Sequence, residues 1–332
     1  MVPGGHGGAA STARAVAGTT DRRLSIDILK IVMALCVIAI HVNELESLPN
    51  GGAFLHGGLA RVAVPVFFLI NGYFFETIAR NGGARAYVVR LLWLFAVWSI
   101  LYLPAWFNAL LQPDLWPLAR FTIMGWWHLW YLPGLALAAA LSSRMQHWPE
   151  QSQVAAMALT FGAGVAIVYG IAFGVLHPSP RIFGDMTVLH RNGLFLGLPF
   201  LLGGMLIRRH DLENSFSLPV LAVAAAAGLA LMVAEGIALR QNASGLANHD
   251  NLAALAVACP AILLFALKLN TQSRSRTVGT YANGLYFLHV AFCVIGFRYT
   301  DLPSLQIFCL AVAGSIVVTA GLIRTGLARR LL

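Results

Sequence analysis

The sequence predicts an all-α protein, a polytopic transmembrane bundle of about ten helices, and three observations lead to this fold class. The chain of 332 residues is 58% hydrophobic and only 11% charged, whereas about 25% of the residues in an average soluble domain are charged. Its Leu, Ala, Val and Phe residues gather in runs of about 20, the length that an α-helix needs to cross roughly 30 Å of hydrocarbon. Strands of a membrane barrel would instead alternate in polarity over about ten residues, so we expect helices.

Ten apolar segments define the expected helices. In chain order they lie at about 26–43, 58–78, 88–107, 121–142, 153–174, 192–207, 217–237, 251–269, 281–297 and 303–323. Residues 1–24 are rich in Gly, Ala and Thr and lack the apolar core of a signal peptide, so we expect a disordered cytoplasmic tail there. Residues 25–323 then form one ten-helix membrane domain, and residues 324–332 form a short cytoplasmic tail.

The distribution of basic residues predicts the orientation of the bundle. Segments on the same side as the N-terminus hold 16 of the 22 Lys and Arg residues. Because short loops rich in Lys and Arg stay in the cytoplasm, both termini are predicted to be cytoplasmic. The formal net charge of +9 is spread between apolar segments rather than gathered on one face, so it does not indicate nucleic-acid binding. All four cysteines lie in apolar runs without a CxxC pair, which favours neither a disulfide framework nor a metal site.

The first expected helix carries polar residues that a lipid-facing helix would avoid. Asp27 and Lys30 lie near its start and His41 near its end. Lys30 and His41 are eleven residues apart, about 1,100° of rotation and about 16 Å of rise, so they share a face. A charge near the bilayer centre costs at least about 2.5–3.5 kcal/mol, and this face is therefore expected to line a polar cavity. The alternative is that Asp27 and Lys30 lie in the headgroup region and His41 at the outer interface.

Three other segments add polar groups. Arg61 starts the second helix, in which a Pro and the pair Asn71-Gly predict a local break of the helix. His128 lies in "WWHLWYL" and His289 in "YANGLYFLHVAF". A lone histidine on an apolar helix is usually a packing residue, but three such segments in one bundle favour a shared polar cavity.

Five segments together resemble the membrane acyltransferase 3 superfamily. "IDILKIVMALCVIAIH" is similar to the family's first helix, in which a basic residue is followed by ten others and then His, here Lys30 and His41. "ARVAVPVFFLINGYFF" resembles a second family segment, with Asn71 where Ser is usual, and "HLWYL", "HRNGLFLGLPFLLGGML" and "LYFLH" resemble three more. The set is most similar to the branch of enterobacterial common antigen and exopolysaccharide O-acetyltransferases. The sequence departs from the family's Arg-x-x-Arg pattern near the third helix, where position 87 is Tyr and Arg85 and Arg90 remain.

The resemblance implies an integral protein of the bacterial inner membrane that moves an acetyl group from cytoplasmic acetyl-CoA to a hydroxyl of a surface polysaccharide or lipid-linked glycan. Acetyl-CoA would be a co-substrate, with no tightly bound cofactor and no metal. His41 would act as general base, since imidazole has an ordinary pKa near 6.5, or as a transient acyl carrier. Lys30 and Asp27 complete the expected catalytic set. Arg85 and Arg90 are candidates for the phosphates of coenzyme A, because guanidinium groups match phosphate oxygens.

The remaining candidates concern the acceptor and the thioester carbonyl. They are Arg61, Asn71 and His128, with Arg191, His190, His289 and Glu235 as weaker candidates. Ordinary interface or packing roles stay open for each. The patterns GxSxG and HExxH are absent from the sequence, so neither a serine nucleophile nor a helix-borne zinc site is expected.

Expected partners are the glycan or glycolipid acceptor, membrane lipid, and either a second copy of the chain or glycan-assembly proteins, but not nucleic acid. Two rival functions remain: a secondary transporter or channel that uses the same polar face, and a non-catalytic subunit of a membrane assembly. The sequence leaves open the acceptor sugar, the position acetylated, the size of the acyl group and the oligomeric state.

Overall fold

The computed structural model describes residues 23–42, 58–111, 119, 122–177, 186–242, 250–272 and 275–332. Within these ranges the chain is helical, and the only β-type pairing is an isolated bridge between Arg23 and Gln272. The all-helical prediction is therefore confirmed for the described part of the chain. Most of the expected N-terminal tail, residues 1–22, lies outside the described residues.

Ten longer helices lie in the described part of the chain and form the bundle. They are α1 (Leu24–Val42), α2 (Ala63–Arg80), α3 (Ala84–Leu101), α6 (Tyr131–Met145), α7 (Glu150–Ala172), α9 (Leu198–Arg209), α10 (Leu218–Asn242), α11 (Leu255–Leu269), α12 (Thr277–Tyr299) and α13 (Ser304–Arg324). Shorter helical elements join them: η2 (Leu59–Val62), α4 (Leu103–Trp106), η3 (Phe107–Leu111), η4 (Trp127–Trp130), η5 (Met186–Leu189), the π-helix η6 (Gly193–Gly197), η7 (Leu212–Asn214) and α14 (Ala328–Leu331).

Seven helical segments of the described chain are long and apolar enough to cross a membrane. The other three expected spans correspond to α6, α9 and α11, which have 15, 12 and 15 residues. At 1.5 Å per residue these helices are about 18–23 Å long, less than the roughly 30 Å of a hydrocarbon core. The 3-10 helix η4 precedes α6 and extends it with tighter turns, and the π-helix η6 precedes α9 and extends it with wider turns. The count of about ten spanning helices therefore stays a prediction.

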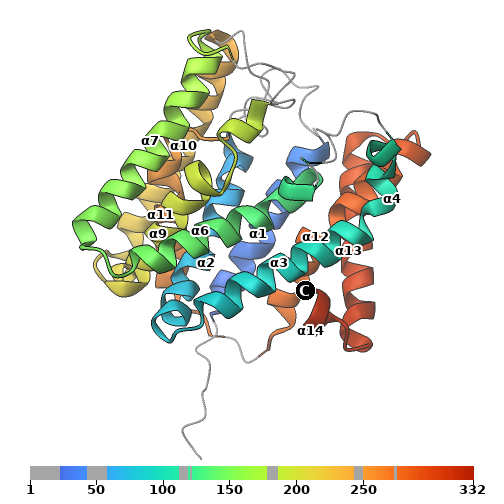
Figure 1. The fold of residues 1–332 in the computed structure, drawn as a ribbon, viewed down its shortest axis with the longest axis horizontal. Helices are drawn as coiled ribbons and strands as arrows, with labels where there is room; N and C mark the ends of the chain where they lie inside the picture. The colour runs from blue at the N-terminus through green and yellow to red at the C-terminus, as the bar shows by residue number, and fades with distance from the viewer. Residues whose placement is uncertain are drawn as a thin grey trace, which may run out of the picture.

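Helices α1 and α2 lie at the centre of the bundle, with α7 and α10 on one flank and α12 and α13 on the other (Figure 1). Burial follows this arrangement: 50–67% of the residues in the apolar windows of the segments containing α1, α2 and α12 are buried, against 17–28% for α3, α7, α10 and α13. The outer helices expose apolar side chains such as Leu159 and Val317, 72% and 70% exposed, which suits contact with lipid. Polar residues on the central helices are therefore directed into protein rather than into lipid.

Small residues let α2 and α9 pack closely. A Cβ added to Gly72 would lie 2.1 Å from the carbonyl oxygen of Leu201, and one added to Gly204 would lie 2.1 Å from that of Leu69. Such small-residue contacts are typical of membrane helix pairs. Gly72 therefore serves helix packing, and α2 is continuous from Ala63 to Arg80.

The predicted break in the second helix is wrong for a simple reason. Pro65 lies in the first turn of α2, where its missing N–H disturbs least. Asn71 stays helical, and its Nδ2 donates to the carbonyl of Phe67 one turn earlier, at 2.9 Å.

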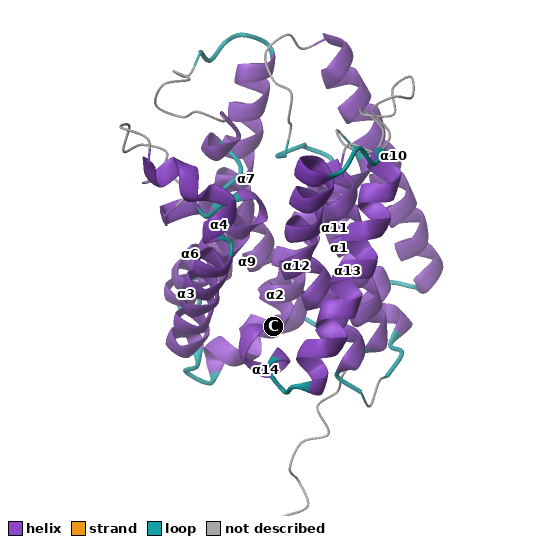
Figure 2. Ribbon diagram, turned by 90° about the vertical axis from the view of Figure 1, so that its right-hand side faces the viewer, coloured by secondary structure: helices purple, strands orange, loops and turns teal. Residues whose placement is uncertain are grey.

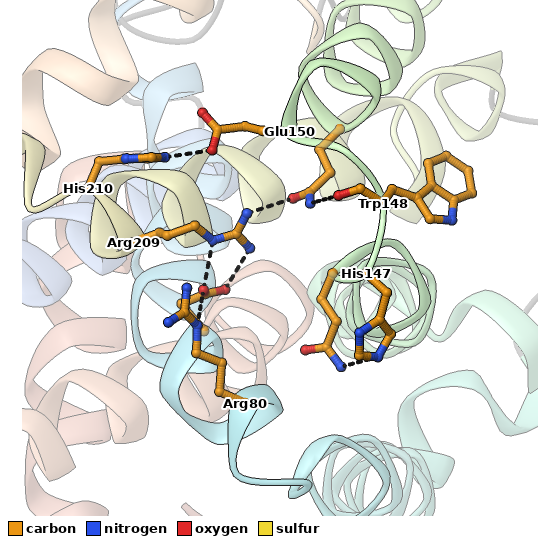
Figure 3. Close-up of polar contacts among 9 residues, drawn as sticks. Arg80, His147, Trp148, Glu150, Arg209 and His210 are labelled. Carbon is orange, nitrogen blue, oxygen red and sulfur yellow. Dashed lines mark hydrogen bonds and ion pairs between the residues drawn. The ribbon is translucent and has the colours of Figure 1, made fainter.

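Buried ion pairs hold the helices together at the end of the bundle that the sequence predicts to be cytoplasmic. Glu76 of α2 is 2% exposed and accepts hydrogen bonds from Arg80 and from Arg209 of α9. Arg209 also donates to Gln153 of α7 at 3.2 Å, so three helices share one network (Figure 3). The absolute orientation in the membrane stays a prediction.

Candidate active site

Helix α1 lines two separate cavities, one toward each of its ends. The first, which we call the histidine cavity, has a volume of about 50 Å³ and is lined among others by His41, Arg61, His128, Arg191, Asp250 and Tyr286. The second, the basic cavity, has a volume of about 950 Å³ and is lined among others by Arg23, Asp27, Lys30, Arg90, Arg276 and Arg329. The two cavities share no lining residue.

Three histidines meet at the histidine cavity, from three elements. The ring centroid of His41 on α1 lies 5.3 Å from that of His289 on α12, and the His289 centroid lies 4.9 Å from that of His128 on η4. Trp127 stacks on His41 from another side, with centroids 5.3 Å apart. The backbone of Trp127 has φ +51°, in the left-handed region that costs a non-glycine residue about 1–2 kcal/mol. Trp127 is the first residue of η4, the short helix that carries His128.

His289 offers an unused acceptor inside this cluster. Its side chain is fully buried, and Nδ1 lies 2.8 Å from the carbonyl oxygen of Leu285. Because a carbonyl oxygen only accepts, Nδ1 is the protonated nitrogen and Nε2 carries a lone pair in the neutral ring. Nε2 is buried and has no hydrogen-bond partner among the described residues.

His128 is 3% exposed, and the residues around it contact its backbone carbonyl and its ring. The Tyr286 hydroxyl donates to its backbone carbonyl at 2.9 Å, and the Tyr102 and Tyr286 rings contact its ring edge-on. The carbonyl of Phe287 approaches the imidazole, but neither ring nitrogen makes a hydrogen bond of good geometry to the described residues. These buried ring nitrogens beside the cavity have no hydrogen-bond partner among the described residues, which is uncommon for buried polar groups.

An ion-pair cluster forms the other wall of the histidine cavity. Asp250 pairs with Arg61 of η2 through a very short contact and with Arg191 at 3.6 Å. Burial raises the pKa of the Asp250 carboxyl, but the two guanidinium groups outweigh this effect and hold its pKa well below the usual range. Asp250 therefore stays ionised, and the three side chains together present one net positive charge to the cavity.

Sequence reasoning missed Asp250. Glu235 of α10 fixes the segment that carries it by accepting from the backbone N–H groups of Ala253 and Ala254, at 2.7 and 2.8 Å. Asn251 adds a hydrogen bond to the carbonyl of Phe195 at 3.1 Å. The available signal was the cluster of polar residues in the loop "RQNASGLANHDN", which did not single out one carboxylate.

Arg191 is positioned by the start of the π-helix η6. The side-chain oxygen of Asn192 accepts from the backbone N–H groups of Leu194 and Phe195, both at 2.9 Å, and so caps η6. The Arg191 guanidinium lies 5.5 Å from the centre of the Trp130 ring, a cation–π distance. Isolated π-turns are frequent at functional sites.

Asn71 lies outside the cavity lining. Besides its bond to Phe67, its Nδ2 donates to the Tyr131 hydroxyl at 2.8 Å, and its Oδ1 accepts from the Tyr87 hydroxyl at 2.8 Å. The two positions at which the sequence departs from the family pattern, 71 and 87, therefore contact each other. Asn71 reaches the cavity through its hydrogen bonds to Phe67 and Tyr131, which both line it.

The basic cavity lies at the opposite end of α1 and is lined by residues of six helices, α1, α2, α3, α12, α13 and α14. Arg23, Lys30, Arg90, Arg276 and Arg329 all line it, against a single acidic lining residue, Asp27. The Lys30 ammonium lies 4.0 Å from the Asp27 carboxylate, and Arg23 pairs with Glu213 at 3.2 Å. Arg90 and Arg329 have no ion-pair partner within the described ranges. The cavity therefore carries excess positive charge, which suits a polyanion.

The structure divides the predicted site residues between the two cavities. His41, Arg61, His128 and Arg191 line the histidine cavity, with His289 in ring contact behind it. Lys30 and Asp27 line the basic cavity together with Arg90, so they form no single constellation with His41. Arg85 is exposed and does not belong to the lining. No group of three or more His, Cys, Asp or Glu within the described part of the chain is arranged to hold a metal ion.

Comparison with known proteins gives one extended match. A family model described as an acyltransferase domain, of the acyltransferase 3 type, matches residues 23–324. An amino-acid racemase from Enterococcus faecalis is 28% identical over 193 residues, which are 54% of this chain and 27% of the relative. A serine/alanine racemase from Enterococcus gallinarum is 27% identical over 214 residues, 58% of this chain and 30% of the relative. The chain thus spans less than a third of each of these relatives, and no solved structure matches it.

Proposed function

The chain belongs to the acyltransferase 3 family, and on that premise we propose that it transfers an acetyl group from cytoplasmic acetyl-CoA to a hydroxyl of a surface polysaccharide or lipid-linked glycan. One observation carries this proposal: α1 lines a large basic cavity at its start and a histidine cavity at its end. A polyanionic donor and a hydroxyl acceptor that approach from opposite sides of a membrane need this arrangement. The location would be a bacterial inner membrane.

The basic cavity supports coenzyme A as the donor. Its volume of about 950 Å³ lies at the upper end of the roughly 300–1,000 Å³ typical of small-molecule sites. Five basic side chains against one acidic one leave a net charge that complements the phosphates of coenzyme A. Lys30 then acts on the donor rather than on the reacting hydroxyl, since it lies about 16 Å along α1 from His41.

The histidine cavity supports the chemical step. In our proposal an imidazole, that of His41, removes the proton from the acceptor hydroxyl as its oxygen attacks the thioester carbonyl carbon. The negative charge that develops on the carbonyl oxygen meets the net positive cluster of Arg61, Asp250 and Arg191. The carbon–sulfur bond then breaks, and the thiolate of coenzyme A leaves and takes up a proton. A route through an acetyl-histidine uses the same side chains, with the imidazole nitrogen attacking first.

The size of the histidine cavity supports an acceptor that enters only in part. About 50 Å³ holds a few water molecules, enough for a hydroxymethyl or hydroxyl group and the acetyl carbonyl. The rest of a sugar would lie outside the cavity. The resemblance to common-antigen and exopolysaccharide acetyltransferases supports a glycan, whereas the racemase names of the relatives describe proteins of which this chain matches less than a third.

The experiment that tests the proposal is release of coenzyme A by the purified protein in nanodiscs, supplied with acetyl-CoA, with and without a glycan extract of bacterial membranes. The His41→Ala variant is compared with the parent and with His147→Ala, which replaces an exposed histidine. We expect glycan-stimulated release by the parent and by His147→Ala, and a loss of about 10²–10⁴-fold in His41→Ala.

Two results would count against the proposal. Release by His41→Ala at the parental rate would remove His41 from the chemistry. Flux of an intact solute across vesicles at a rate that does not depend on acetyl-CoA, without thiol release, would favour the rival function of a transporter.

A further inference from the structure

The segment that follows α13 forms part of the wall of the basic cavity. After Arg324 the chain turns at Gly326, whose φ of +75° favours glycine, and α14 runs back along the bundle. Gly326, Ala328, Arg329 and Leu332 all line the cavity. In Figure 2 α14 lies at the lower end of the bundle, close to α12 and α13.

Specific hydrogen bonds hold this segment in place. The indole N–H of Trp98 on α3 donates to the carbonyl of Leu331 at 2.9 Å, and Asn283 of α12 donates to the backbone oxygen of Leu332 at 2.9 Å. Ala328 and Leu332 are each 8% exposed. A polar segment that merely trailed into water would make neither bond, so the segment occupies a defined position.

Arg329 is the one basic residue that this segment directs to the cavity. Its neighbour Arg330 lies on the same short helix but does not line the cavity. Arg329, like Arg90 on α3, has no ion-pair partner in the described part of the chain, whereas Arg23 and Lys30 already pair with Glu213 and Asp27. Two unpaired guanidinium groups from two elements thus line one cavity of net positive charge.

We propose that residues 325–332 are a docked element of the donor site, in which Arg329 contacts a phosphate group of coenzyme A together with Arg90. This inference rests on the proposed function, because it assigns a further binding residue to the same donor. The docked position of α14 leaves the cavity at about 950 Å³, so the segment forms a wall of the site and does not fill it.

A contact chain links this wall to the histidine cavity. The Trp98 ring stacks on Phe287 with centroids 4.9 Å apart and an interplanar angle of 11°. The carbonyl of Phe287 accepts from the Tyr102 hydroxyl at 2.7 Å, and the Tyr102 ring contacts His128. A continuous series of contacts therefore leads from the docked segment through α3 and α12 to the histidines.

The test measures binding of coenzyme A to the full chain in nanodiscs by isothermal titration calorimetry. Arg329→Ala is compared with Arg330→Ala, which removes the same charge from the adjacent position. We expect at least about tenfold weaker binding for Arg329→Ala, because a charge-assisted hydrogen bond is lost. For Arg330→Ala we expect less than about a twofold change, because Arg330 does not line the cavity and a charge at a distance from the ligand is screened by salt. Equal effects of the two substitutions would show only general electrostatic attraction and would overturn the proposal.

Hydrogen exchange gives a second readout that a purely structural role would not change. Saturating coenzyme A is expected to slow amide exchange in residues 327–332 of the parent. Trp98→Phe keeps the stacking ring and removes the donor to Leu331, so exchange should be faster without ligand and affinity lower. Unchanged exchange on saturation would overturn the proposal.

Arg90→Ala separates this inference from the proposed function. If Arg90→Ala weakens binding and Arg329→Ala does not, the inference about the segment fails alone. If the parent does not bind coenzyme A, both the inference and the proposed donor fail.

Discussion

The substitution Asp250→Asn tests whether the ion-pair cluster of the histidine cavity is held together by its one carboxylate. The Asp250 side chain is 10% exposed and that of Arg61 is 4% exposed, so this pair is buried, whereas the Arg191 side chain is 27% exposed. Removing one partner of a buried pair leaves the other charge uncompensated and costs about 3–5 kcal/mol. The more exposed Arg191 pair adds no more than about 1 kcal/mol. We therefore expect the free energy of unfolding to fall by about 3–5 kcal/mol.

The assay is unfolding in mixed detergent micelles by titration with sodium dodecyl sulfate, followed by tryptophan fluorescence. The matched control is the double variant Arg61→Gln/Asp250→Asn, in which neither partner is charged. Because removal of both charges relieves the uncompensated guanidinium, the double variant should be more stable than the sum of its two single variants by more than about 1 kcal/mol. Strictly additive losses would refute the reasoning, since they would mean that the two side chains do not interact.

The same carboxylate predicts a pH dependence of stability. The pKa of Asp250 is lower in the folded protein than in the unfolded chain, where a carboxyl titrates near about 3.9. Its contribution is therefore fully present above about pH 4 and is lost as the pH falls through the folded pKa. The stability difference between the parent and Asp250→Asn should stay constant from pH 7 to about 5 and shrink below about 4. A difference that grows on acidification would contradict this sign.

Three further tests, one of them with a matched control, probe other parts of the structure. Arg90→Ala should weaken binding of coenzyme A by at least about tenfold, and Arg85→Ala, an exposed arginine outside the cavity, by less than about twofold in the same titration. Asn71→Ala removes three hydrogen bonds inside the bundle and should lower the free energy of unfolding by about 1–3 kcal/mol, with unchanged affinity for coenzyme A in a binding assay. Glu76→Gln leaves Arg209 without its carboxylate partner and should destabilise the protein by about 3 kcal/mol, while affinity measured by calorimetry is retained.

Much of the fold could be predicted from the sequence because hydrocarbon selects for the length and composition of each segment. Every expected apolar segment contains a helix in the structure, with most ends displaced by a few residues and the start of α6 by ten. The predicted break in α2 failed because the Asn-Gly pair was interpreted from local propensity alone. In the structure Gly72 serves the contact with α9, a tertiary effect that local propensity does not contain.

The site was predictable where its residues lie on helices that carry polar groups in apolar surroundings. The shared face of α1 pointed to His41 and Lys30, and the histidines of η4 and α12 do meet His41. Lys30 and His41 lie in two different cavities because they are about 16 Å apart along the helix axis. That they share one face of the helix does not show whether they line one cavity or two. Asp250 and Arg329 lie on a loop and on a short helix, and only the packing of those segments against α10, α3 and α12 brings them to a cavity.

The stretch of α1 between the two cavities suggests why an acyltransferase of this kind would keep them apart. Met33, Ala34 and Ile38 are all buried there, line neither cavity, and belong to the two hydrophobic cores of the bundle. Water competes with a sugar hydroxyl for a thioester, so an open polar channel would allow hydrolysis of the donor as readily as transfer to the acceptor. In the proposed reaction, this close-packed apolar layer would exclude water until the narrow pantetheine arm of the donor occupied it. The charged part of the donor would then stay in the basic cavity, and only the acetyl group would have to reach His41.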